Sequence, residues 1–256
     1  MLVDAHAHVD RYGAELAEAV EQIERHRILT VAVSMDVASY RRAKALARRC
    51  AYLRPTFGVH PWEAPRYADD LAALDEHLAE TPMIGEAGLD FRFVEDASSH
   101  ESQRQVFDYQ CAWAMRRSVP MNLHTAGAER EVLAALRRHR LTGCIVHWYS
   151  GPTALIDDYL ELGCWFTVGA EVVVSQAIQR IARLVPLDRL LLETDNPGAW
   201  NWLEGSPGMP ALLLDVRAKV AELRRMDVAA LERSLDENWG AVERRVPAWS
   251  ERRRLS

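Results

Sequence analysis

Lysine is nearly missing from this chain of 256 residues: only Lys44 and Lys219 occur, so arginine supplies 29 of the 31 basic residues. Aspartate and glutamate together number 37, and the formal net charge is −6. Such a chain has no basic field over its whole surface that would draw in nucleic acid. A nucleic-acid substrate is not excluded, however, because bound divalent cations can supply positive charge locally.

Cysteine is scarce as well, and its spacing excludes two common roles. Cys50, Cys111, Cys144 and Cys164 lie far apart, without a Cys-x-x-Cys pair and without the density of a small secreted disulfide scaffold. We therefore expect four buried free thiols. The sequence also lacks an apolar run long enough to span a bilayer, and its first residues already read as a strand. From these features we expect no membrane partner and a cytoplasmic location.

Internal repeats, low-complexity segments and obvious linkers are absent too, and short apolar runs alternate with amphipathic stretches from end to end. We predict strands at 2–6, 29–35, 53–59, 82–86, 120–124, 143–147, 164–169 and 189–194. We predict helices at 14–26, 39–50, 68–79, 99–117, 127–139, 152–162, 175–184, 207–223 and 227–243. Eight βα units favour the α/β class and a single-domain (β/α)8 TIM barrel over residues 1–246, followed by a basic C-terminal tail at 247–256. An open doubly wound sheet remains the alternative, because periodicity alone does not show closure.

The nine histidines are distributed unevenly over these elements. His6 and His8 lie two residues apart at the end of the first predicted strand, so in an extended chain their side chains point to the same face. Five histidines fall at predicted strand ends, where a barrel of this kind carries its catalytic groups: His6, His8, His60, His124 and His147. Four others fall in or at predicted helices, where we expect surface positions: His26, His77, His100 and His139.

Carboxylates occupy the same kind of position. Glu86 ends the fourth predicted strand, and Glu193 and Asp195 end the eighth. Six groups are therefore expected to converge on one mouth of the barrel: His6, His8, Glu86, His124, His147 and Asp195. Four imidazoles and two carboxylates suit two divalent ions, with Glu86 placed to bridge them. Such a pair would lower the pKa of a bridging water and stabilise the leaving oxygen. The sequence does not decide among Mg, Mn, Zn and Ni.

Several motifs carry a resemblance to a known family. They are DAHAHVD at the start, GVHPW at 58–62, IGEAGLDF at 84–91, ESQRQVFDYQCAWAMRRSVPMNLH at 101–124, VHWYSG at 146–151 and LLLETDNP at 190–197. In this order they resemble the TatD family of metal-dependent deoxyribonucleases, within the amidohydrolase-like barrels. The resemblance implies metal ligands at the same six positions that the strand ends indicate.

Other residues near the predicted mouth have candidate roles. We expect Asp195 to take a proton from the attacking water, in addition to touching a metal, and Glu86 to share in catalysis. Glu193 and Asp4 are expected to orient a ligand histidine, with structural hydrogen bonding as the alternative. Candidate substrate-binding residues are His60, Arg92, Trp148 and Trp200. The tryptophans are expected on loops, where they would stack on bases or pack the barrel rim.

One departure from the family concerns the substrate. Where family members usually continue the strand-five histidine with an arginine-containing segment, this chain reads His124-Thr125-Ala126-Gly127-Ala128. The function expected first is a deoxyribonuclease that trims single-stranded DNA ends as a metal-dependent phosphodiesterase. The alternatives are an amidohydrolase-type enzyme acting on a small molecule or acylated nucleotide, which the missing arginine favours, and a non-catalytic subunit of a larger complex.

Overall fold

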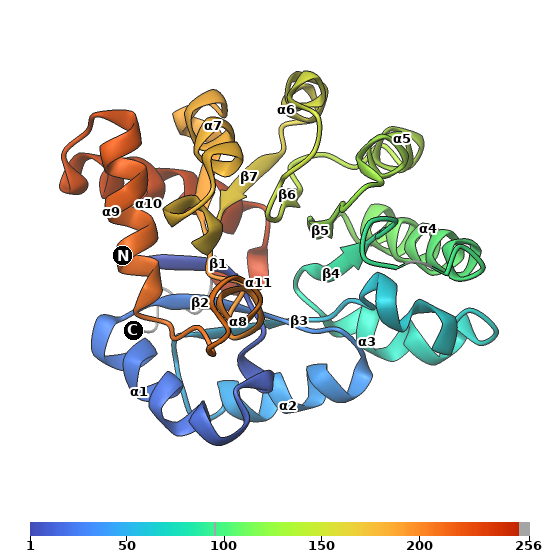
Figure 1. Ribbon diagram of the computed structural model, residues 1–256. Coiled ribbons are helices and arrows are strands. Elements are labelled where there is room, and N and C mark those ends of the chain that lie inside the picture. Colours follow the sequence, from blue (N-terminus) through green and yellow to red (C-terminus); the bar gives the residue numbers. More distant parts are fainter. Residues whose placement is uncertain (95, 251–256) are drawn as a thin grey trace. The chain divides into compact units, whose positions relative to one another are not determined.

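The computed structural model describes residues 1–94 and 96–250 (Figure 1). These residues form two compact units. Unit 1 comprises Met1–Val33, Arg41–Pro55 and Phe166–Gly240, and unit 2 comprises Ser34–Tyr40, Thr56–Trp165 and the segment from Ala241 onward. Within the described residues, no helix combines the length and the apolar character needed to cross a membrane.

Unit 1 is built on parallel strands. The strands β1 (Val3–Ala7), β2 (Leu29–Val33) and β3 (Leu53–Thr56) follow one another in the order β1-β2-β3, and β7 (Trp165–Val168) pairs in parallel with β8 (Leu190–Leu192). All five residues of β2 are buried. Burial of every residue, four of them apolar, is typical of a parallel strand that is covered on both faces.

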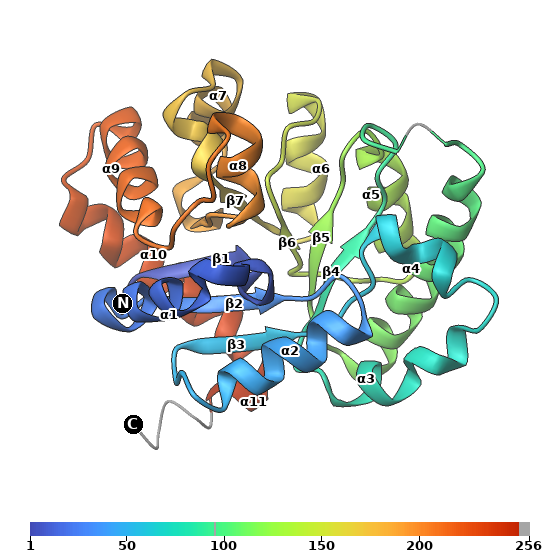
Figure 2. The same cartoon turned by 60° about the horizontal axis from the view of Figure 1, so that its bottom comes forward.

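Among the described residues, six α-helices start or end in unit 1. They are α1 (Leu16–His26), α2 (Val37–Ala47), α7 (Gln176–Leu184), α8 (Gly198–Glu204), α9 (Leu212–Arg224) and α10 (Val228–Arg244). One core joins Ala19 and Ile23 of α1 to Ala32 of β2, Ala43 of α2 and Leu53 of β3. The elements that carry these residues are labelled in Figure 2. Because Ala19 and Ile23 are four residues apart, α1 presents one apolar stripe to the sheet.

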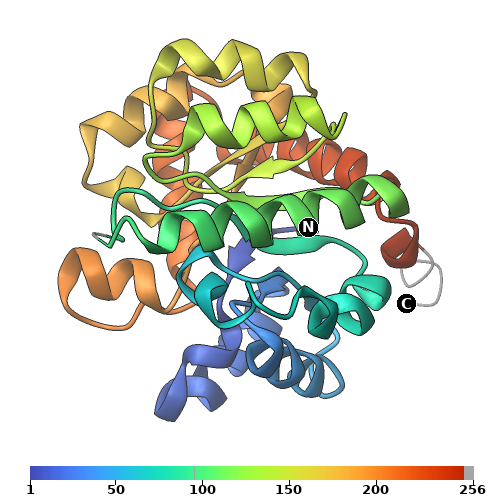
Figure 3. The ribbon, with the colours of Figure 1, turned by 90° about the vertical axis from the view of Figure 1, so that its right-hand side faces the viewer.

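Unit 2 contains β4 (Ile84–Gly88), β5 (Met121–His124) and β6 (Ile145–Val146), which pair in parallel in that order. Its helices are α3 (Asp75–Glu80), α4 (Ser99–Arg117), α5 (Glu129–Arg138), α6 (Ile156–Glu161) and α11 (Pro247–Ser250). The helix α4 packs against β4 and α3 and runs beside α5, as Figure 3 shows in green. The predicted span of 99–117 for this helix agrees with the structure.

Two buried glutamines on α4 hold backbone segments that lead into the candidate site. The Gln110 side chain accepts a hydrogen bond from Val59 N (2.8 Å) and donates one to Val59 O (3.2 Å). About two helical turns earlier, the Gln103 side chain accepts a hydrogen bond from Asp90 N (2.8 Å) and donates one to Asp90 O (3.1 Å). Each glutamine side chain thereby satisfies the backbone N–H and C=O of one buried residue. The helix thus fixes Val59, next to His60, and Asp90, which follows β4.

Three sequence-based expectations need correction. The segment around Trp200 and Trp202 is the helix α8, not a loop. Pro197 precedes the helix and Gly205 ends it in the left-handed conformation, so the two residues that disfavour helix lie outside it. His77 is buried against the rings of Tyr40 and Phe57 and is not a surface residue. The helix expected at 68–79 begins only at Asp75, after a 3-10 turn at Leu71–Leu74.

The predicted C-terminal tail at 247–256 lies partly outside the described residues. Its first four residues form α11, and Trp249 there is buried. The domain boundary at residue 246 stays a prediction.

Candidate metal centres

Three predicted ligands of unit 1 come together where β1 ends. Backbone hydrogen bonds join Asp195 N to His6 O (2.9 Å) and His8 N to Asn196 O (2.8 Å), so the segment after β8 runs alongside the end of β1. As a result Asp195 Oδ1 lies 3.6 Å from His6 Nε2 and 3.3 Å from His8 Nε2. One ligand atom from each of the three residues lies within 4.8 Å of the others. We call these residues the HHD cluster.

Asp195 has an unusual backbone conformation. Its φ is +50°, in the left-handed region that non-glycine residues rarely adopt. The residues on both sides are held by hydrogen bonds: Thr194 donates through N (2.9 Å) and Oγ1 (2.6 Å) to the Asp4 carboxylate, and Asn196 Nδ2 donates to Met209 O (2.9 Å). The surrounding bonds therefore impose the conformation that aims the Asp195 carboxylate at the two histidines.

Asp4 and Glu193 occupy the positions beside this cluster. Burial raises the pKa of Asp4 to about 7, against the opposing effect of the hydrogen bonds from Thr194. Its carboxylate also accepts a longer hydrogen bond from His6 N (3.3 Å). The partners of Asp4 are therefore the backbone N–H groups of His6 and Thr194 and the hydroxyl of Thr194. Glu193 is fully buried, and its carboxylate lies beside Gly169, where a Cβ would approach it to 3.2 Å.

In unit 2, a single carboxylate oxygen gathers three histidines. Glu86 Oε1 lies 2.8 Å from His124 Nδ1, 3.4 Å from His60 Nε2 and 3.4 Å from His147 Nε2. Glu86 is buried at the centre of β4, and His124 and His147 follow from β5 and β6. We call these four residues the EHHH cluster. Sequence reasoning placed His60 with the substrate and missed its contact with Glu86.

Close backbone contacts make this arrangement possible. Gly88 has a φ of +154°, and a Cβ at that position would lie 1.9 Å from His124 O. A Cβ at Gly58 would lie 2.2 Å from Glu86 O. Only glycine permits backbones to approach so closely, so these two residues determine how near the segments carrying Glu86, His124 and His60 can lie.

Asp90 adds a second carboxylate to the EHHH cluster. Its Oδ2 lies 3.2 Å from His124 Nε2. Burial lowers the pKa of His124, but the hydrogen bonds with Asp90 and Glu86 outweigh burial and raise it to about 9. Burial raises the pKa of Asp90, and the hydrogen bond and charge of His124 outweigh it to leave a pKa of about 2. Asp90 lies in the IGEAGLDF motif, but the motif does not indicate which ring its carboxylate contacts.

The donor sets of both clusters fit divalent metal ions. Imidazole nitrogens with carboxylate oxygens suit Zn, Mn, Fe and Ni, and the ligand atoms of the HHD cluster and of His60, Glu86 and His124 lie close enough to share an ion. That the two clusters form one catalytic mouth, with Glu86 bridging two ions, stays a prediction.

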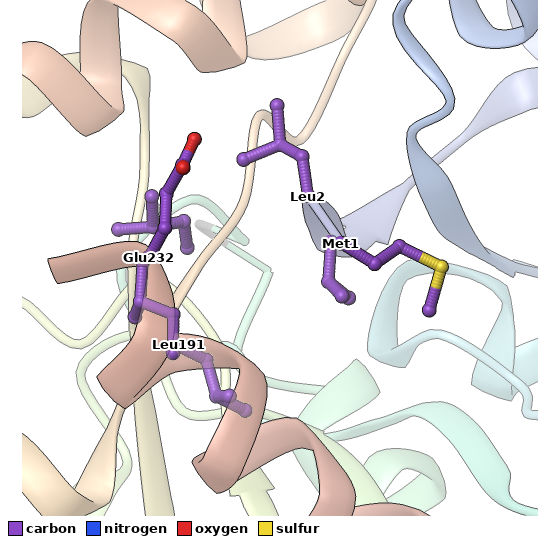
Figure 4. Close-up of a pocket in the computed structure, with 7 residues that line it drawn as sticks. Met1, Leu2, Leu191 and Glu232 are labelled. Atoms are coloured by element: carbon purple, nitrogen blue, oxygen red, sulfur yellow. The ribbon is translucent and has the colours of Figure 1, made fainter. Parts of the chain in front are cut away.

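The candidate substrate-binding residues are placed as follows. The Trp148 ring meets the His147 ring edge-on at 6.3 Å, and its backbone φ is +38°. Trp200 lies in α8 beside Gly208. The guanidinium of Arg92 donates to Ser150 Oγ (2.9 Å) and lies 3.8 Å from Glu129 Oε1. A small pocket elsewhere in unit 1 has a mainly apolar lining without histidine (Figure 4): Met1, Leu2, Val3, Leu191, Leu192, Glu232 and Leu235.

Comparison with solved structures establishes the fold class. A TatD homologue from Escherichia coli K12 matches with a TM-score of 0.82 and 26% identity, covering 94% of this chain and 97% of that one. The α/β fold of this chain is therefore that of the (β/α)8 TIM barrels, as the alternation of strands and helices predicted. With histidine–carboxylate clusters at its strand ends, it falls in the class of metal-dependent barrel hydrolases.

The family follows from sequence comparison. The model of TatD related DNases matches residues 3–243, and the chain belongs to this family. An uncharacterized metal-dependent hydrolase of Bacillus subtilis, YabD, is 27% identical over 93% of this chain and 97% of its own length. The 3'-5' ssDNA/RNA exonuclease TatD of Dickeya dadantii is 33% identical over 73% of this chain and 75% of its own. The resemblance carried by the sequence motifs is confirmed.

Proposed function

We propose that this protein is a metal-dependent phosphodiesterase that removes nucleotides from single-stranded DNA ends in the cytoplasm. The observation that carries the proposal is the pair of histidine–carboxylate clusters at strand ends, in a family whose relatives include an enzyme named as a 3'-5' ssDNA/RNA exonuclease. A net charge of −6 favours a short single-stranded end over a long duplex, because the negative charge of the chain as a whole would repel the many phosphates of a duplex.

The proposal includes two divalent ions, one at each cluster. The ligands are His6, His8 and Asp195 for one ion, and His124 and His147 with Glu86 for the other; Mg, Mn, Zn and Ni are the candidate metals. Bound ions would lower the pKa of a coordinated water and stabilise charge on the phosphate oxygens.

The protein's own groups then handle the proton and the substrate. Asp195 accepts the proton from the attacking water, since its carboxylate faces both histidines of the HHD cluster and keeps partial exposure. Arg92 is a candidate for pairing with a phosphate and Trp148 and Trp200 for contact with bases. Arg92 is also held by Ser150 and Glu129, so its side chain is already oriented.

The test is hydrolysis of end-labelled single-stranded DNA by purified protein with Mg²⁺ or Mn²⁺, beside Asp195→Asn. Stepwise shortening that disappears in the variant supports the proposal and gives the direction of cleavage. If metal-loaded protein leaves DNA intact but hydrolyses small amide or ester substrates, the proposal is wrong and the amidohydrolase-type alternative replaces it. Intact DNA and inert small substrates would leave the non-catalytic subunit.

A further inference from the structure

Every hydrogen-bonding site of the Asp90 carboxylate that the structure shows has a defined partner. Oδ1 accepts from Arg92 N (2.9 Å) and Phe93 N (2.8 Å). Oδ2 accepts from Trp62 Nε1 (2.7 Å) and faces His124 Nε2 (3.2 Å). The backbone of Asp90 is fixed in turn by Gln103. A buried carboxylate with fixed hydrogen bonds can set the proton position and the orientation of the side chains that it contacts.

The first such group is His124. Because an ionised carboxylate only accepts hydrogen bonds, Nε2 of His124, which faces Asp90, keeps its proton, and the proton that the ring gives up when a cation binds comes from the other nitrogen. The other nitrogen, Nδ1, then faces Glu86 and is the one that can bind a cation. His60 has the opposite arrangement: its Nδ1 accepts from Trp62 N (3.1 Å), so its Nε2 carries the proton toward Glu86. Of these two rings, His124 is therefore suited to bind a metal and His60 to donate to Glu86.

The second group is Trp62. Its indole N–H is bound to Asp90, and its ring meets the His60 ring edge-on, with centroids 4.8 Å apart. Yet 50% of the residue is exposed. A large aromatic plane that is both fixed and open loses little conformational freedom when a flat ligand stacks on it. Nucleobases stack on such planes irrespective of sequence.

We propose that Asp90 is a positioning residue that shares one carboxylate oxygen between His124 and Trp62, and so couples a metal ligand to a base-stacking surface. The proposal has two parts. Its metal half, that Asp90 orients His124 as a ligand, depends only on the EHHH cluster. The stacking half rests on the proposed function and names Trp62 as the contact for a base next to the cleaved bond.

Asp90→Asn tests the metal half. Two backbone N–H groups require an acceptor, so the amide oxygen stays with Arg92 N and Phe93 N and the NH2 group faces Trp62 Nε1 and His124 Nε2. The NH2 group and the indole N–H of Trp62 are then two donors that face each other without an acceptor. Toward His124 the NH2 group donates, so Nε2 becomes an acceptor and the ring proton moves to Nδ1. Zn²⁺ affinity, measured by calorimetry without substrate, is expected to fall roughly 10–100-fold.

A second variant separates positioning from folding. In Asp90→Asn/Trp62→Phe the opposing indole N–H is gone, so thermal stability is expected to recover toward that of Trp62→Phe. The His124 proton stays on Nδ1, so Zn²⁺ affinity is expected to remain low. Trp62→Phe alone is expected to bind Zn²⁺ within about twofold of the unmodified protein. Asp96→Asn, an exposed change in the same connection, is the matched control. Recovery of affinity together with stability would show that Asp90 is merely structural and overturn the proposal.

The proton position has its own readout. In Zn²⁺-loaded protein with ¹⁵N-labelled histidine, the His124 ring is expected to carry its proton on Nε2 and none on Nδ1. A proton on Nδ1 with the metal on Nε2 would contradict the proposal regardless of any activity.

The stacking half is tested with two oligonucleotides that differ only in the terminal residue, one with a base and one abasic. Trp62→Ala is expected to raise KM roughly tenfold for the first and to leave KM for the second unchanged. Equal effects on both would overturn the stacking role. If neither oligonucleotide is cleaved by the unmodified protein, the proposed function fails, while the calorimetric and NMR results still decide the metal half.

Discussion

Among single residues, Asp195 allows a particularly clean separation of chemistry from folding. Its φ of +50° would be costly for most replacements, but asparagine is the side chain, after glycine, that enters the left-handed region most readily. Asp195→Asn is therefore expected to keep the fold and lose the charge that faces His6 and His8. We predict a fall in kcat of about 10²–10⁴-fold and a Tm within a few degrees of the unmodified protein.

The control for this substitution is Asp188→Asn, which removes a charge from an exposed side chain of the same unit. Its activity and Tm are expected to stay unchanged. Full activity in Asp195→Asn would refute the proposed role of this carboxylate.

Gly88 tests how closely the backbones around the EHHH cluster must approach. A Cβ there would lie 1.9 Å from His124 O, and the φ of +154° is unfavourable for alanine. Gly88→Ala is expected to cost ~3 kcal/mol or more of the free energy of unfolding and to weaken metal binding. Gly198→Ala, with open space around its Cβ at the start of α8, is expected to be neutral or slightly stabilising. Urea unfolding of both variants is the measurement, and equal costs would contradict the argument.

At the level of elements, the amides of α4 act as backbone clamps. Gln110→Leu removes both bonds to Val59 and leaves a buried N–H and C=O without partners, at an expected cost of about 2–4 kcal/mol. Gln105→Leu lies on the exposed side of the same helix and loses one bond to Ala68 O, so its expected cost is below about 1 kcal/mol. Chemical denaturation distinguishes the two. A cost for Gln110→Leu as small as that of the control would mean that the segment holding His60 needs no clamp.

The same elements show what the sequence could predict. The strands were found because apolar runs of four to eight residues bounded by turn residues are distinctive, and the span of α4 because it has no interior glycine or proline. The helix α8 was missed because Pro197 and Gly205 mark loops as readily as helix ends. His77 was misplaced because its helix position does not reveal the rings of Tyr40 and Phe57, which come from elsewhere in the chain.

The candidate site follows the same division. The strand-end rule predicts which residues lie near a ligand cluster, because it depends only on strand direction. It does not predict hydrogen-bond partners such as Asp90 with His124, since these depend on the path of the connection after β4 and on Gln103. The sequence thus indicates the ligands and leaves open what orients them.

For the whole molecule, metal binding is expected to raise stability, because ions held by the folded clusters bind the unfolded chain less well. At about 100 times the dissociation constant, one ion would contribute ~2.7 kcal/mol. Thermal unfolding with and without Mn²⁺ measures this gain. Glu86→Ala is expected to lose most of the gain at the EHHH cluster and to lower metal content, whereas Glu161→Ala, an exposed position, is expected to keep both. Unchanged metal content in Glu86→Ala would refute its role as a ligand.

The free thiols lead to a prediction about alkaline pH. Burial raises the pKa of Cys144 to about 11 from an ordinary value near 9. Between these two values the unfolded chain loses the thiol proton while the folded chain keeps it, so the unfolded state binds fewer protons and stability falls as pH rises. One such thiol contributes a slope of at most about 1.4 kcal/mol per pH unit. Burial also raises the pKa of Cys111 and Cys164, which steepens the decline.

Cys144→Ala is expected to be less stable at about pH 8, because it removes buried volume, but to lose less stability than the unmodified protein between about pH 9 and pH 10.5. Val146→Ala shortens a buried side chain of β6, two residues after Cys144, and creates a cavity without removing an ionisable group. Its stability should therefore fall with pH at the same slope as that of the unmodified protein. Urea unfolding under reducing conditions across this range gives the three slopes. If Cys144→Ala and Val146→Ala declined in parallel with the unmodified protein, the Cys144 thiol would not be the source of the pH dependence, and the decline would belong to other groups such as the buried thiols of Cys111 and Cys164.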